Sequence, residues 1–389
     1  MKNFEFHNPT KIVFGADSVA KLAKLVPADA RVLILYGGAS AEKTGTLAEV
    51  RAALAGAGRH VQEFGGIEPN PSYETLMRAI EQVRRDKLDF LLAVGGGSVI
   101  DGTKFVAAAA LYDGEAWEIA EQGGANVHQA LPFASVLTLP ATGSEMNSGG
   151  VVTKKATQAK LSFRNPLLYP RFSILDPAKT FTLPAKQVAN GLVDAFVHTT
   201  EQYLTYTVNA RVQDRFAEGL LQTLVEIAPQ AVASPDDYET RANLMWTATL
   251  ALNGLIGAGV PQDWATHMIG HELTALYDID HARTLALVLP ALLDVQREQK
   301  RGKLLQYGER VWGIGSEAGT DDQRIDAAIA QTRSFFEGLG IPTRLSAYEL
   351  GQDAIEAVLK QLEAHGMTAL GEHRDIDLAR SRRILEAAL

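Results

Sequence analysis

The stretch Phe90–Leu111 reads FLLAVGGGSVIDGTKFVAAAAL, and it decides the fold. It begins with an apolar run, continues through Gly95–Ser98 and ends in a pattern typical of a helix. A short apolar run that stops at glycines and leads into a helix predicts one strand–turn–helix unit of a parallel sheet. Strands of such sheets are buried on both faces, so they read as continuous apolar runs.

Similar units occur on both sides of this stretch. Short apolar runs predict strands, and the amphipathic stretches between them predict helices. Strands that alternate with helices favour a Rossmann-like parallel sheet, whose ligands bind at the carboxyl ends of the strands. The predicted strands are Lys11–Phe14, Arg31–Tyr36, Val61–Phe64, Phe90–Val94, Phe133–Leu139 and Phe172–Leu175, and the predicted helices are Asp17–Leu25, Ala41–Ala57, Tyr73–Lys87 and Ile100–Leu111.

The pattern changes near Asp176, and the rest of the chain reads as helices. We therefore expect two domains, an α/β domain over residues 1–179 and an all-helical domain over residues 180–389. Because proline interrupts helices, we expect Pro290 to separate two of them. The predicted helices are Lys186–Tyr206, Asn209–Ser234, Tyr238–Leu255, Gln262–Tyr277, Arg283–Leu289, Leu292–Val311, Asp322–Leu339 and Asp353–His365.

Composition excludes several classes of protein. The 389 residues carry a net charge of −9 and no dense basic stripe, which disfavours binding to nucleic acid or to an anionic membrane. The chain has no cysteine, so disulfides, zinc–thiolate sites, iron–sulfur clusters and thiol nucleophiles are excluded. The N-terminus lacks the apolar region of a signal peptide. We expect a cytoplasmic protein with no nucleic-acid or membrane partner.

The glycine turn is a candidate phosphate site. Glycines let the backbone approach a ligand, and free N–H groups at a helix start attract an anion. Gly95, Gly96, Gly97 and Ser98 would then cradle a pyrophosphate; the alternative is a tight turn without a ligand. A nucleoside triphosphatase is disfavoured, because its loop ends in Gly-Lys-Ser/Thr whereas Lys104 stands last here.

A second glycine loop follows the strand Arg31–Tyr36 and reads Gly37-Gly38-Ala39-Ser40. In NAD-binding folds an acidic residue near this position often binds the ribose 2′-hydroxyl. This loop has no acid, and an acid would repel a 2′-phosphate. Unless it is an ordinary glycine-rich loop, the sequence favours NADP(H) over NAD(H), with Gly37, Gly38 and Ser40 near the adenosine ribose.

Histidines gather in the helical half. Asp194 and His198 are four residues apart, as are His267 and His271, so each pair shares a helix face. A lone histidine on an apolar face is usually a core residue, but this concentration favours a metal site. Imidazole and carboxylate ligands suit Zn²⁺ or Fe²⁺. The predicted ligand set is Asp194, His198, His267 and His281.

Five segments resemble one known family, the iron-containing (group III) alcohol dehydrogenases. The subgroup that the chain resembles most is that of NADPH-dependent aldehyde reductases and butanol-dehydrogenase-like enzymes. The resemblance covers essentially the whole chain and implies a dehydroquinate synthase-like fold. The segments are PTKIVFG at Pro9–Gly15, GGGS with its aspartate at Gly95–Asp101, TLPATGSE at Thr138–Glu145, NGLVDAFVHTTEQY at Asn190–Tyr203, and HMIGHELTALYDIDHARTLALVLP at His267–Pro290.

The resemblance also implies roles for individual residues. It implies that the four Asp and His residues above bind the metal. It places Gly95–Ser98 and Asp101 at the pyrophosphate and nicotinamide side of the cofactor. We also expect a homodimer. The residues assigned to the rest of the cofactor site are Asn70, Thr138, Thr142, Asn147 and Lys160.

The implied reaction is reversible hydride transfer from NADPH to short or medium aldehydes, which gives primary alcohols. A metal would stabilise the developing alkoxide. His271 is the candidate proton relay, unless it only lines the core or the substrate pocket. Three alternatives remain open: a dehydroquinate synthase-like or glycerol dehydrogenase-like enzyme of the same fold, a metal hydrolase, and a non-catalytic metal-binding protein. The first would need several basic residues, and residues 190–281 hold only Arg211, Arg215 and Arg241.

Overall fold

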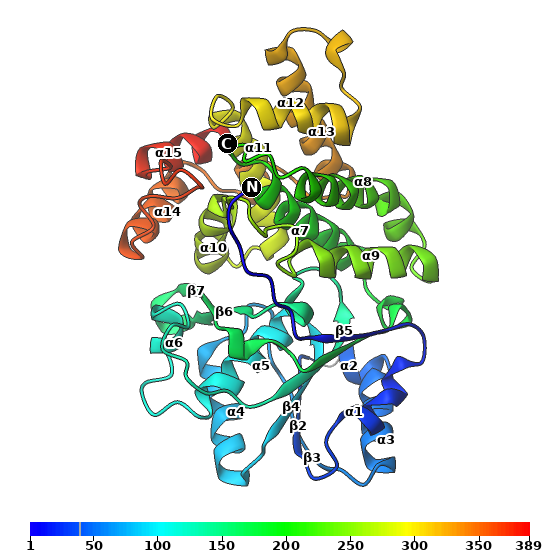
Figure 1. The fold of residues 1–389 in the computed structure, drawn as a ribbon. Coiled ribbons are helices and arrows are strands. Elements are labelled where there is room, and N and C mark those ends of the chain that lie inside the picture. The colour runs from blue at the N-terminus through cyan, green and yellow to red at the C-terminus, as the bar shows by residue number, and fades with distance from the viewer. Residues whose placement is uncertain (39) are drawn as a thin grey trace. The chain divides into compact units, whose positions relative to one another are not determined.

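The computed structural model of the chain describes residues 1–38 and 40–389, and of residue 40 the backbone alone. The described chain forms two compact units (Figure 1). The sheet unit comprises residues 7–184 and 234–249, and the helical unit comprises residues 1–6, 185–233 and 250–389. The boundary near residue 179 stays a prediction.

The sheet unit is built on the predicted parallel sheet. Its six strands lie in the order β1-β8-β5-β4-β2-β3, and each neighbouring pair is parallel. This confirms the expected α/β architecture. The strands are β1 (Lys11–Phe14), β2 (Arg31–Tyr36), β3 (His60–Phe64), β4 (Phe90–Gly96), β5 (Phe133–Leu139) and β8 (Phe172–Leu175).

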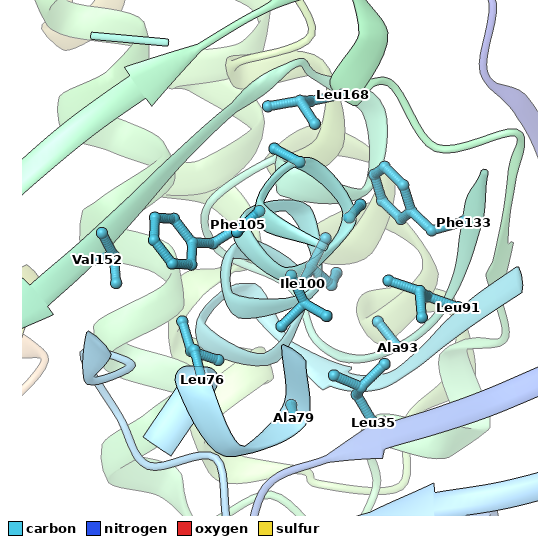
Figure 2. Packing of buried hydrophobic residues seen from close by; sticks show 14 of the residues in the cluster. Leu35, Leu76, Ala79, Leu91, Ala93, Ile100, Phe105, Phe133, Val152 and Leu168 are labelled. Carbon is cyan, nitrogen blue, oxygen red and sulfur yellow. The ribbon is translucent and has the colours of Figure 1, made fainter. Parts of the chain in front are cut away.

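Alternate residues of the central strands face opposite sides of the sheet. Leu33 and Leu35 of β2 belong to one buried cluster, which also contains residues of α4 (Tyr73–Asp86) and α5 (Gly97–Ala109). Figure 2 shows this packing around Ile100 and Phe105. The intervening residues of β2 pack in a second cluster with α3 (Thr46–Gly56). Burial on both faces explains why β2 and β4 read as continuous apolar runs.

An antiparallel hairpin was not predicted. It consists of β6 (Gly149–Lys154) and β7 (Ala159–Arg164). Its apolar side packs on α5, where the rings of Phe163 and Phe105 meet edge to face at 5.8 Å between centroids. The hairpin lacked a sequence signal because small and charged residues such as Gly149 and Lys160 interrupt its alternation.

The helical unit is all-helical, as expected from the sequence. Residues 185–389 contain no strand longer than an isolated bridge. No helix of the described chain is long and apolar enough to cross a membrane. Most of α9 (Tyr238–Ala251) belongs to the sheet unit. The α-helices of the helical unit are α7 (Ala185–Tyr203), α8 (Arg211–Ala233), α10 (Ala265–Tyr277), α11 (His281–Val295), α12 (Arg301–Trp312), α13 (Asp321–Gly338), α14 (Gln352–Ala364) and α15 (Leu378–Ala387).

The expected break at Pro290 is wrong. Helix α11 runs without interruption from His281 to Val295 and contains Pro290. A proline inside a helix costs about 3 kcal/mol. The segment Leu285–Leu293 is buried, and burial of each large aliphatic side chain contributes about 1.5–3 kcal/mol. Tertiary packing therefore outweighs the local preference of the proline.

Candidate functional site

The glycine turn joins β4 directly to α5, and its tight packing requires glycine. A Cβ at Gly97 would lie 2.4 Å from the side chain of Thr142, and a Cβ at Gly95 would lie 2.5 Å from that of Val99. Gly96 is the N-cap of α5 and offers no side-chain acceptor to the first N–H groups of the helix. These groups are the donors that a phosphate uses at a helix start.

Three predicted cofactor residues meet beside this turn. The backbone N–H of Asn70 donates to Ser98 Oγ at 3.3 Å. Lys160, a residue of strand β7, donates from Nζ to Asn70 Oδ1 at 2.9 Å. Asn70 has a left-handed backbone with φ of 53°, which asparagine tolerates better than most residues. The loop after β3 and the hairpin are thus connected to the glycine turn.

A buried polar node fixes the loop that carries Thr142 and Asn147. Lys104 Nζ donates to Ser144 Oγ at 2.8 Å, to Asn147 Oδ1 at 2.9 Å and to the Gly149 carbonyl at 2.6 Å. Lys104 was not predicted to have a role at the site. The sequence signal that could have indicated this role is its position on α5, seven residues after Gly97 and therefore on the same face of the helix.

Asp101 holds the other side of the same loop. Its carboxylate accepts from Ser144 Oγ at 2.5 Å and from the Val151 N–H at 3.0 Å. Burial raises the pKa of Asp101, and burial lowers the pKa of Lys104 to about 7. Both groups are therefore desolvated, and both form a hydrogen bond with the Ser144 hydroxyl. Thr138 lies near the end of β5, one of the strands that lead to this edge.

The second glycine loop is described only in part. Gly37 and Gly38 follow β2, and the Gly37 carbonyl accepts from the Gly66 N–H at 2.8 Å. Among the described residues, nothing lies within 4 Å of a Cβ built at Gly38. Ala39 lies outside the described residues, and of Ser40 only the backbone is described, at the start of α2 (Ser40–Lys43). The expectation about Ser40 stays a prediction.

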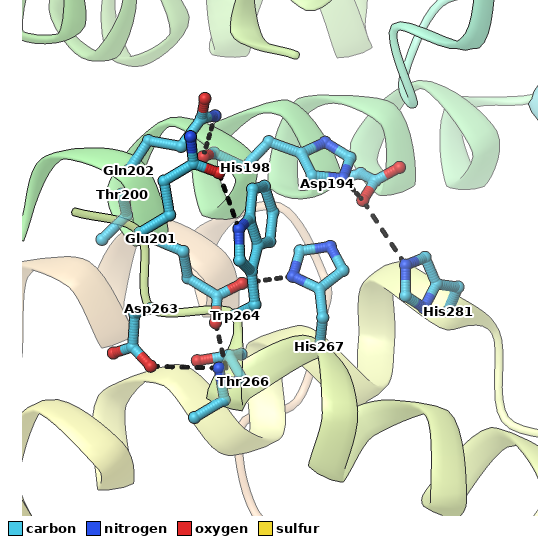
Figure 3. Close-up of polar contacts among 12 residues, drawn as sticks. Asp194, His198, Thr200, Glu201, Gln202, Asp263, Trp264, Thr266, His267 and His281 are labelled. Carbon is cyan, nitrogen blue, oxygen red and sulfur yellow. Dashed lines mark hydrogen bonds and ion pairs between the residues drawn. The ribbon is translucent and has the colours of Figure 1, made fainter. Parts of the chain in front are cut away.

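Helices α7, α10 and α11 bring three predicted ligands together (Figure 3). One possible ligand atom of each of Asp194, His267 and His281 lies within 4.8 Å of the others. Asp194 Oδ1 lies 3.6 Å from His198 Nε2 and 3.8 Å from His281 Nε2, which is too far for a hydrogen bond.

These residues fit a divalent cation. Asp194 Oδ1 is buried and accepts no hydrogen bond from any residue that the structure describes. Two ligands at about 2.1 Å from a tetrahedral ion lie roughly 3.4 Å apart, close to the spacings around Asp194. The donors are one carboxylate oxygen and imidazole nitrogens, a set that suits Zn²⁺ or Fe²⁺.

The other two predicted histidines border this group. The ring of His198 stacks on that of His267 at 4.7 Å between centroids, although His198 is not one of the three residues grouped above. The ring centroid of His271 lies 5.2 Å from that of His281 and 6.2 Å from that of His267. His271 is buried beside these two rings.

Sequence reasoning missed Glu201. Its carboxylate is hydrogen-bonded to His267 Nδ1 and accepts from the Thr266 N–H at 2.7 Å (Figure 3). Burial, followed by the nearby Asp263 carboxylate, raises the pKa of Glu201 well above its usual value. The available signal was its spacing: Glu201 stands three residues after His198, on the same face of α7.

Two models of one protein family together match almost the whole chain. The model of the iron-containing alcohol dehydrogenases matches residues 9–177, and that of the C-terminal domain of the same family matches residues 188–388. The chain is 60% identical to the NADPH-dependent aldehyde reductase YqhD of Escherichia coli K12 over 390 residues, with 100% of both chains covered.

A further relative and a solved structure of YqhD agree with this family. The probable NADH-dependent butanol dehydrogenase 1 of Bacillus subtilis is 40% identical, again with 100% of both chains covered. The crystal structure of YqhD from E. coli K-12 matches with a TM-score of 0.98 at 60% identity, over 100% of this chain and 99% of that one. The chain therefore belongs to the iron-containing alcohol dehydrogenase family.

Proposed function

We propose that this protein is a metal-dependent, NADPH-dependent aldehyde reductase that converts short and medium aldehydes to primary alcohols, reversibly. The observation that carries the proposal is 60% identity to an NADPH-dependent aldehyde reductase over the whole chain. The residues agree with it, because the sheet unit offers a phosphate cradle and the helical unit offers a metal-ligand cluster. An oxidoreductase that uses both a nicotinamide cofactor and a metal needs these two kinds of site.

NADPH supplies the hydride, and the sheet unit binds and orients the cofactor. The N–H groups of Gly95–Ser98 bind the pyrophosphate at the start of α5. Asp101 and Lys104 hold the loop that carries Thr142 and Asn147. This loop, together with Thr138 and Lys160, would bind the nicotinamide half of the cofactor. The Asn70 side chain fixes the Lys160 ammonium beside the cradle.

The preference for NADPH over NADH rests on the second glycine loop. The loop Gly37-Gly38-Ala39-Ser40 consists of small residues and contains no carboxylate that would oppose a 2′-phosphate. The relatives do not decide this point by themselves, because the Bacillus subtilis relative is named as NADH-dependent. The loop of this chain therefore supports NADPH independently of the relatives.

The helical unit holds the cation. Asp194, His198, His267 and His281 would ligate Zn²⁺ or Fe²⁺, and a bound cation acts as a Lewis acid on an aldehyde carbonyl. His271, one turn after His267 and beside His281, would deliver the proton that the product alcohol needs.

A direct assay tests the proposal. Purified protein is treated with a chelator, reconstituted with Zn²⁺ or Fe²⁺, and mixed with a series of straight-chain aldehydes and either NADPH or NADH. We expect loss of NADPH absorbance that requires both the metal and the aldehyde. Turnover without any reduced nicotinamide would favour a hydrolase instead, and equal use of both cofactors would contradict the NADPH assignment.

We further propose that the enzyme acts as a homodimer in the cytoplasm. The proposal about the compartment rests on the absence of cysteine from the chain. Sedimentation velocity of the purified protein measures the oligomeric state directly, and a species with the mass of one chain, 42.0 kDa, would contradict the dimer.

A further inference from the structure

The metal-ligand cluster consists of Asp194, His198, His267 and His281, and helix α7 contributes the first two from one of its faces. Asp194, His198 and Glu201 are spaced by four and three residues, so they point the same way. Asp194 lies near His281, and His198 stacks on His267. Glu201 completes this row, yet it lies behind the cluster, at the Nδ1 side of the His267 ring.

The contact with Glu201 determines which nitrogen of His267 is available. A carboxylate accepts hydrogen bonds, so the pairing favours the tautomer that carries its proton on Nδ1. The lone pair of His267 then lies on Nε2. A histidine that binds a metal through one nitrogen usually donates from the other nitrogen to a carboxylate or carbonyl oxygen.

The Glu201 carboxylate is itself held in place. Its second oxygen accepts from the Thr266 N–H at 2.7 Å, so its two oxygens contact consecutive residues at the start of α10. Glu201 is 2% exposed, so bulk solvent competes little for these contacts. The backbone carbonyl of Glu201 also accepts from the Asp263 N–H at 2.9 Å.

The turn before His267 is fixed by a second buried pair. Asp263 accepts from the Ala265 N–H at 3.0 Å and pairs with Lys300 Nζ at 2.8 Å. Trp264, which lies between Asp263 and Ala265 in the chain, has a left-handed backbone with φ of 64°. This conformation is uncommon for a residue with a bulky side chain. Such a conformation persists only where the surroundings impose it. Glu201 and Asp263 accept the Thr266 and Ala265 N–H groups and so help to hold this turn.

We propose that Glu201 is a positioning residue of the metal site, which orients His267 with Nε2 toward the cation. The inference rests on the metal site of the proposed function. Glu201 does not contact the cation; it acts through the His267 ring and the Thr266 N–H. Its loss should therefore weaken metal binding while the four proposed ligands remain in the chain.

A matched pair of variants tests this role. Glu201→Gln keeps the size of the side chain, but its amide can donate to Nδ1 and so favour the tautomer with the proton on Nε2. The control is Glu272→Gln. Glu272 is also a buried carboxylate that contacts a histidine Nδ1, at 2.7 Å, but this histidine is His365, which is not a proposed metal ligand.

The measurement is the Kd for Zn²⁺ of the full-length, metal-free proteins, obtained by competition with a chromophoric chelator. We expect Glu201→Gln to weaken Zn²⁺ binding by about 10–100-fold and Glu272→Gln to leave it unchanged. Thermal unfolding of the metal-free proteins shows whether either variant loses general stability. An unchanged Kd in Glu201→Gln overturns the inference, whereas a wild-type protein that binds no Zn²⁺ overturns the proposed metal site itself.

A second measurement uses the wild-type chain and does not depend on how the variant folds. Nuclear magnetic resonance of the Zn²⁺-loaded protein with ¹⁵N-labelled histidine reports which ring nitrogen carries a proton. The His267 signal is assigned with the His267→Gln variant. We expect His267 to keep a hydrogen-bonded proton on Nδ1 and to bind Zn²⁺ through Nε2. A proton on Nε2, or Zn²⁺ on Nδ1, overturns the role of Glu201.

Discussion

Asp194 Oδ1 and His281 Nε2 lie 3.8 Å apart, although the two residues belong to different helices, α7 and α11. The separation exceeds that of a hydrogen bond and is close to the roughly 3.4 Å between two ligands of one tetrahedral cation. The carboxylate oxygen is buried and accepts no hydrogen bond from the described residues, and a bound cation would compensate its charge. This relationship makes the metal dependence of the enzyme testable.

We expect His267→Ala to lose its metal. The change removes one ligand and breaks the contact with Glu201, so metal content and turnover should both collapse while the helical fold survives. The measurements are metal analysis, circular dichroism and NADPH oxidation. His373→Ala, at an exposed histidine, is the control and should behave as wild type. Full activity in metal-free His267→Ala protein would exclude the metal mechanism.

The second prediction concerns cofactor choice. Gly38→Asp introduces a carboxylate where the described residues leave open space, so repulsion of a 2′-phosphate should dominate over steric effects. A pair of like charges at ~4 Å costs about 1 kcal/mol in water and roughly 4 kcal/mol at an effective dielectric near 20. The expected loss is ~5- to 1000-fold in affinity for NADPH relative to NADH.

The values to compare are the KM for NADPH and the KM for NADH in wild type and variant. Gly38→Asn is the control, because it adds nearly the same volume without the charge. A wild type that prefers NADH, or a preference that Gly38→Asp does not change, would contradict the assignment of NADP(H).

Lys104→Met tests whether the buried node positions the nicotinamide loop. The variant removes the donor to Ser144, Asn147 and Gly149 and leaves their oxygens desolvated. Breaking a buried charged contact typically costs about 3–5 kcal/mol of stability. We expect a lower unfolding temperature and NADPH binding that is weaker by on the order of tenfold, or ~1.4 kcal/mol.

Fluorescence titration with NADPH gives the Kd, and the Kd for Zn²⁺ should not change. Lys154→Met is the matched control. Lys154 belongs to β6, the strand that begins at the Lys104 partner Gly149, but its ammonium lies over the Tyr73 and Trp117 rings. Wild-type NADPH affinity in Lys104→Met would show that the node has only a structural role.

His271→Gln distinguishes a proton relay from a ligand. The ring lies beside His281, but the proposed ligand set is complete without it. We expect normal metal content, normal NADPH binding and a kcat lowered by about 10²–10⁴-fold. The kinetics are measured on two aldehydes of different length. A KM that rises with aldehyde length at constant kcat would instead mean that His271 lines the pocket, and loss of metal would make it a ligand.

The sequence alone determined that the sheet is parallel and which residues of the metal-ligand cluster share a helix face. The run Phe90–Val94, followed by three glycines, predicts a buried strand that turns sharply into a helix. Likewise, four-residue spacing places Asp194 with His198, and His267 with His271, on single helix faces. These are local properties, because a strand repeats every two residues and a helix every 3.6, whatever surrounds them.

Only the tertiary structure decided which faces meet. Packing between segments determines four features that the sequence did not predict. They are the β6–β7 hairpin, the uninterrupted helix through Pro290, the three contacts of Lys104 and the bond between Glu201 and His267. Glu201 and His267 are 66 residues apart in the chain, and no local pattern links them. Burial makes such contacts favourable, since a desolvated carboxylate or ammonium group must find a partner, and the partner is whichever segment packs against it.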